Sequence, residues 1–124
     1  MEDTSAVPVD LEMTAGLPYK RRVRVSGAAL IWPTQDSYEV RGQLRVGKLP
    51  TSQLIANLGQ YLNAFIELGD IVVDIGLTGS QTRTLSTGYY DLVLSDPGAI
   101  DARAIRILFG KVKIKTLMTG VSGD

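Results

Sequence analysis

The stretch from Leu85 to Asp96 most constrains the fold, because it consists of a turn, an alternating strand and a second turn. Tyr90 and the leucines after it share one phase of a two-residue period, so we expect them to face inward. Leu85, Gly88 and Tyr90 have the spacing of a tyrosine corner. In that motif a tyrosine hydroxyl donates to backbone a few residues upstream. The motif predicts a β-sandwich in which these three residues have structural roles.

Alternation of the same kind recurs along the chain. Two glycines lie inside expected strands; Gly42 predicts a bulge or a close backbone approach, and Gly110 predicts a bend. One helical turn is expected between Leu77 and Leu85. With turn signals about every ten residues, the pattern predicts an all-β, Ig-like or Greek-key sandwich of about seven or eight short antiparallel strands. The expected strands span residues 7–13, 19–26, 37–46, 70–75, 89–95 and 103–116, with two short strands between 51 and 69.

The length of 124 residues fits one domain. We expect a flexible arm at residues 1–6, a sandwich domain at residues 7–118 and a flexible tail at residues 119–124. The arm is acidic, unlike the basic start of a signal peptide, and the longest apolar runs are too short to span a bilayer. The sequence therefore predicts no membrane partner and a product made in the cytoplasm.

The chain contains no histidine and no cysteine, so it lacks the commonest general base and metal ligand and any thiol nucleophile. Its acidic residues are scattered rather than paired or clustered. We therefore predict a protein that is not an enzyme and uses no metal or cofactor. The 13 basic and 13 acidic residues balance, which predicts no nucleic-acid partner.

Three features are candidates for partner contacts. Trp32, in the loop Ile31-Trp32-Pro33, is either a contact hot spot or a plug that closes one end of the sandwich. Two basic clusters are either solvated faces that guard sheet edges or docking surfaces for an acidic partner. They contain Lys20, Arg22 and Arg24 in one strand and Lys111, Lys113 and Lys115 in another.

The order of elements resembles the small β-sandwich domains of tailed-phage virions, namely LtfC-like minor tail proteins and the N-terminal domain of baseplate upper proteins. The segments that carry the resemblance are Val9–Gly16, Tyr19–Val25, the loop with Trp32 and Pro33, Tyr38–Arg45, Gly88–Asp96 and Gly110–Ile114. Residues 47–69 depart from the pattern.

The resemblance implies a non-enzymatic minor tail or baseplate protein without catalytic residues. Such a protein is made in the host cytoplasm, resides in the virion and binds other virion proteins, often in a homo-oligomeric or symmetric assembly. One alternative is a capsid decoration protein on the head lattice. A second is a carbohydrate-binding sandwich, which would use exposed aromatic residues such as Trp32, Tyr61 and Tyr89.

Overall fold

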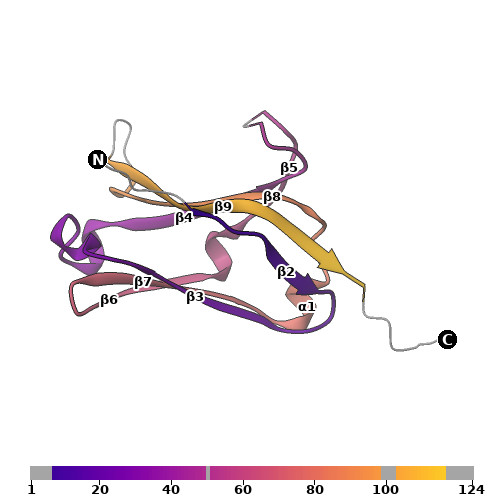
Figure 1. Ribbon diagram of the computed structural model, residues 1–124, viewed down its shortest axis with the longest axis horizontal. Coiled ribbons are helices and arrows are strands. Elements are labelled where there is room, and N and C mark those ends of the chain that lie inside the picture. Colours follow the sequence, from indigo (N-terminus) through magenta and orange to yellow (C-terminus); the bar gives the residue numbers. More distant parts are fainter. Residues whose placement is uncertain (1–6, 50, 99–102, 117–124) are drawn as a thin grey trace.

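Two β-sheets pack face to face in the computed structural model, which describes residues 7–49, 51–98 and 103–116 (Figure 1). The larger sheet has six strands and the smaller has three. This arrangement confirms the predicted all-β sandwich. The predicted arm and tail, and the domain boundary at residue 118, lie outside the described residues.

The larger sheet is built around β8 (Gly88–Ser95). β8 pairs antiparallel with β4 (Glu39–Arg45) on one side and with β9 (Ala104–Lys115) on the other, and β5 (Leu54–Asn57) pairs with β4. At Gly42 a Cβ atom would lie 2.6 Å from the Leu92 side chain and 2.9 Å from the Asp91 carbonyl oxygen. The close approach predicted at this glycine is therefore confirmed.

The N-terminal segment forms the opposite edge of the larger sheet. It is divided into β1 (Val7–Pro8) and β2 (Leu11–Thr14), and both pair in parallel with β9. The expectation of purely antiparallel strands is therefore wrong at this edge. A tight hairpin makes neighbouring strands antiparallel, but these strands come from opposite ends of the chain and no hairpin sets their direction. Between them, the Val9 N–H donates to the Phe109 carbonyl at 2.8 Å.

The smaller sheet places β7 (Asp70–Leu77) between β3 (Tyr19–Val25) and β6 (Leu62–Glu67), all antiparallel. β5 and β6 are the two short strands predicted between residues 51 and 69. The predicted helical turn is also confirmed as α1 (Gly79–Thr82), where the Thr78 hydroxyl accepts from the Gln81 N–H at 3.2 Å. Short 3-10 turns connect other strands at Ala28–Leu30, Gln35–Ser37 and Leu58–Tyr61.

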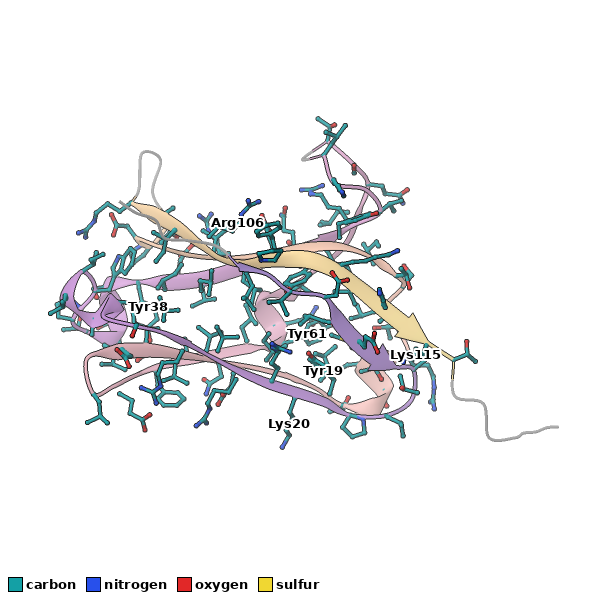
Figure 2. The ribbon with its side chains drawn as sticks, in the orientation of Figure 1. Tyr19, Lys20, Tyr38, Tyr61, Arg106 and Lys115 are labelled. Atoms are coloured by element: carbon teal, nitrogen blue, oxygen red, sulfur yellow. The ribbon has the colours of Figure 1, made fainter. Side chains whose placement is uncertain are left out.

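The hydrophobic core fills the space between the sheets, with Tyr38 and Tyr61 among its aromatic members (Figure 2). Both sheets contribute, because inward apolar residues alternate with outward ones in most strands. The most deeply buried members include Leu44, Leu92 and Leu94 of the larger sheet and Ile71 and Val73 of the smaller sheet.

Candidate contact surface

Tyr90 ties β8 to the N-terminal segment. Its hydroxyl donates to the Val9 carbonyl oxygen at 2.6 Å, so the predicted local bond to backbone just upstream is wrong. The cross-strand partner of Tyr90 is Gly110, which has no side chain, and a Cβ there would clash with the Val9 carbonyl. The N-terminal chain can therefore come close enough to accept the bond. Burial raises the pKa of Tyr90 to about 12, so the phenol remains a donor at neutral pH.

The other two residues of the predicted corner have structural positions. Leu85 is buried in the core. Gly88 is also buried, and a Cβ at this position would clash with the Arg45 carbonyl oxygen and lie 2.8 Å from the Ile55 side chain. Gly88 therefore allows β8 to pass close to β4 and β5.

Trp32 closes one end of the sandwich rather than forming a contact site. Only 1% of its surface is exposed, and its indole Nε1 donates to Asp96 Oδ1 at 2.7 Å. Arg103 lies over the indole ring at 5.7 Å and pairs with Asp96 at 3.1 Å. Hydrogen bonds from Arg103 and Trp32 lower the pKa of Asp96. Of the two roles considered for Trp32, the plug is confirmed and the exposed hot spot is wrong.

The burial of Trp32 also bears on carbohydrate binding. Tyr61 is buried too, so two of the three aromatic residues considered for a sugar platform face the core. Tyr89 remains half-buried on the outer side of the larger sheet. One such ring does not form the platform of two or three aromatic residues on which that alternative depended.

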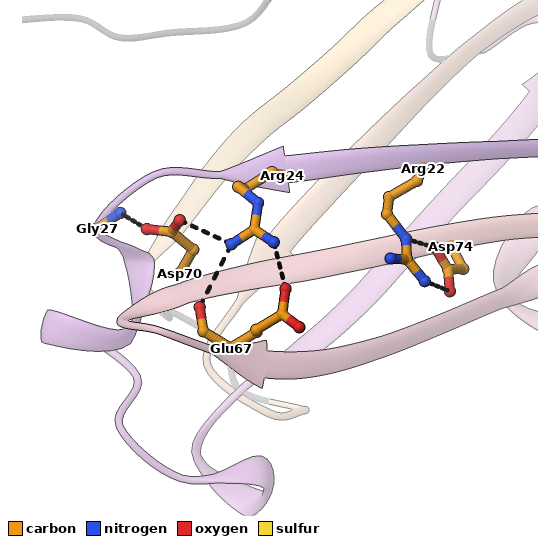
Figure 3. A network of polar contacts seen from close by, with 6 residues as sticks. All are labelled: Arg22, Arg24, Gly27, Glu67, Asp70 and Asp74. Atoms are coloured by element: carbon orange, nitrogen blue, oxygen red, sulfur yellow. Dashed lines mark hydrogen bonds and ion pairs between the residues drawn. The ribbon is translucent and has the colours of Figure 1, made fainter.

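The basic cluster of β3 is engaged with acidic residues of its own sheet (Figure 3). Arg22 holds Asp74 through two hydrogen bonds of 2.7 and 3.0 Å. Arg24 pairs with Asp70 at 2.9 Å and also with Glu67. These arginines are therefore largely neutralised within the sheet, whereas Lys20 projects from its outer side (Figure 2).

The same contacts shift the acidity of two carboxyl groups. The bonds from Arg22 lower the pKa of Asp74. The Gly27 backbone N–H, at 2.8 Å, and Arg24 lower the pKa of Asp70. Both carboxylates are held ionised by β3 and the turn that follows it, which supports an internal structural role for this cluster.

The C-terminal cluster separates into paired and unpaired lysines. Lys113 lies 3.7 Å from Asp10, and Lys115 lies 2.9 Å from Glu12, whose pKa it lowers. These acidic residues come from the N-terminal segment, which covers this part of β9, so the expectation that these lysines guard an open edge is wrong. Lys111 differs, because its side chain lines a hollow on the outer face of the larger sheet.

This hollow is the candidate contact surface, and the sequence predictions did not identify it. It has a volume of about 660 Å³ and lies over β8 and β9, bounded by the connection between β4 and β5 that stands above the sheet in Figure 1. Strand register brings its members together, since Tyr89 pairs with both Arg45 and Lys111. The side chains that line it include Asp10, Gln43, Arg45, Lys48, Leu49, Tyr89, Asp91, Arg106, Phe109 and Lys111.

Two cation–aromatic pairs characterise the hollow. Lys48 Nζ lies 5.6 Å from the centre of the Tyr89 ring, and Arg106 Cζ lies 4.2 Å from the centre of the Phe109 ring. The outward phase of Tyr89 was visible in the sequence. Its encounter with Lys48 was not, because that lysine lies in a turn whose path depends on the tertiary structure.

In the described part of the chain, no three acidic side chains gather as a metal-ion site would require. No helix within residues 7–49, 51–98 and 103–116 has the length and apolar character needed to span a bilayer. No protein-family model and no curated protein matches the chain.

Proposed function

We propose that this protein is a non-enzymatic structural component of a tailed-phage virion, in the tail or baseplate, that holds neighbouring proteins through surface contacts. The proposal rests on the resemblance of its element order to virion sandwich domains. Made in the host cytoplasm, the protein would then reside in the particle, with other virion proteins or further copies of itself as partners.

The observation that carries the proposal is the placement of large apolar side chains at loop tips. Leu30 and Leu68 are 88% and 92% exposed, and their loops are joined by a bond of 3.1 Å from the Ala29 N–H to the Gly69 carbonyl. Leu49, 66% exposed, lies in the connection that borders the hollow. Neighbouring proteins would cover these side chains and gain the apolar burial that the isolated domain lacks.

The interior of the domain supports a scaffold role. Trp32 and Tyr90 each join segments far apart in the chain, through bonds to Asp96 and to the Val9 carbonyl. Such bonds tie distant segments of the domain together. A rigid frame of this kind suits repeated contacts in a particle, because each contact then loses little conformational freedom on assembly.

The experiment is to locate the protein in purified phage particles that carry this gene. Mass spectrometry would detect it, and immunogold electron microscopy would place it, with particles from a deletion mutant as the control. We expect label on the tail or baseplate. Label on the head would instead support the capsid decoration alternative, and absence from the particles would contradict both virion roles.

A matched pair of variants tests the apolar tips. Leu30→Ser with Leu68→Ser should reduce incorporation when supplied to the deletion mutant, because both side chains would lose their burial against a neighbour. Leu17→Ser, which changes another exposed leucine on a different turn, should be incorporated normally. Equal incorporation of all variants would exclude the tips as contacts.

A further inference from the structure

The outer-face hollow is large enough for an extended chain. It has a volume of about 660 Å³ and lies next to a second hollow of about 390 Å³; Gln43 and Asp91 line both. The two adjoining hollows together make up one surface region over β9, β8 and β4. A segment of several residues could lie along it, whereas a compact ligand would leave most of it open to solvent.

The charges that line the hollow favour an anionic occupant. It contains four cationic side chains and two carboxylates. One carboxylate, Asp10, also interacts with Lys113 and accepts from the Lys111 backbone N–H at 3.1 Å. Within the described residues, Lys48, Arg106 and Lys111 form no ion pair. Figure 2 shows Arg106 on the outer side of the larger sheet, where a bound partner would meet it.

The aromatic rings distinguish a peptide from a single-stranded nucleic acid. Proteins bind single strands by stacking bases on open ring faces. Here Lys48 lies over Tyr89 and Arg106 lies over Phe109. A base would have to displace these cations before it could stack. A carboxylate would instead bind the cations in place, because the rings already restrict their positions.

We propose that this hollow binds an extended acidic segment of a partner protein, whose carboxylates pair with Lys48, Arg106 and Lys111. The inference deepens the proposed function, and rests on it, because it names the partner chemistry at one contact surface. Such pairs lie at a solvent-exposed site, so the affinity should fall as the salt concentration rises.

Fluorescence anisotropy with the purified protein tests this inference. The probe is a fluorescein-labelled peptide of Glu-Thr repeats, with a Gln-Thr peptide of the same length and an oligothymidylate for comparison. We expect the acidic peptide to bind most tightly. Replacing two cations, Lys48→Gln with Lys111→Gln, should weaken that binding about tenfold.

The control is Lys20→Gln with Arg22→Gln, which removes the same charge from the outer face of the smaller sheet, away from the hollow, and should leave the affinity within about twofold. The inference would be overturned if the acidic peptide did not bind, or if the neutral peptide bound equally well. It would also be overturned if oligothymidylate bound more tightly, or if the two double variants had equal effects. These measurements use the isolated protein, so their failure is distinct from absence of the protein from particles.

Discussion

At the scale of single residues, the side chains that hold this fold together reach partners far away in the sequence. Tyr90 bonds to the Val9 carbonyl and Trp32 bonds to Asp96. Both residues were identifiable in the sequence as special, because tyrosine and tryptophan need a hydrogen-bond partner when buried. Neither partner could be identified, since the partner depends on which strands become neighbours.

Tyr90→Phe should lower the free energy of unfolding by about 1–2 kcal/mol, because it leaves the part-buried Val9 carbonyl without its donor. Urea denaturation measures the change. Tyr38→Phe is the matched control: the buried Tyr38 hydroxyl has Gln35 as a polar neighbour but makes no hydrogen bond of normal geometry. Its removal should be neutral or stabilising. An unchanged midpoint for Tyr90→Phe would contradict the role assigned to its hydroxyl.

Leu68→Asn should raise the thermal midpoint, with a gain of about 1 kcal/mol in stability. Leu68 has a φ of 52° and Gly69 a φ of 83°, a pair of positive values that favours Asn-Gly in a tight hairpin turn. Differential scanning calorimetry measures the change. Leu30→Asn removes an equally exposed leucine outside the positive-φ region and should give no gain, so equal effects of both variants would contradict the backbone explanation.

At the scale of elements, the outer face of the smaller sheet is a set of cross-strand ion pairs. Arg22 on β3 lies directly opposite Asp74 on β7. Next to this pair, Val72 of β7 is fully buried and has Arg24 of β3 and Phe65 of β6 as its two cross-strand neighbours. The sequence showed the basic face of β3 but not the acidic strand beside it. Opposite charges directly across a sheet stabilise the pairing, so the Arg22–Asp74 pair supports the smaller sheet itself.

Acid should destabilise the domain through this face. The pKa values of Asp70 and Asp74 are lower in the folded chain than their ordinary value of 3.8. Their stabilising contribution is therefore complete above that value and is lost as the pH falls through the lower folded values. Urea midpoints at about pH 6 and about pH 3 measure the loss. The double variant Arg22→Gln with Arg24→Gln should lose less stability between these two pH values than the unmodified protein. An equal loss of stability would contradict the role given to these ion pairs.

At the scale of the whole molecule, the two ends of the described chain complete one sheet. β1 and β2 lie along β9, and Leu11 and Met13 contribute to the core from this edge. This closure also brings Asp10 and Glu12 to the lysines of β9. It therefore leaves Lys111 as the member of that cluster that lines the outer hollow.

Leu11→Ala should cost about 2–5 kcal/mol in unfolding free energy, because it creates a cavity where the N-terminal segment joins the core. Leu11 is 2% exposed, whereas Leu17, 45% exposed, provides the control. Leu17→Ala should be nearly neutral in the same chemical denaturation. Equal effects of the two substitutions would show that β2 is not an integral part of the core.

The sequence by itself determined the class of fold and most strand positions, because a two-residue period and turn residues act locally. It also indicated the helical turn near Thr78 and the close approach at Gly42. Only the tertiary structure decided the parallel pairing of β1 and β2, the bond from Tyr90 to Val9 and the burial of Trp32. It likewise decided which cations remain unpaired in the hollow. These features join residues distant in the chain, and alternation specifies which face a side chain occupies but not which strand lies beside it.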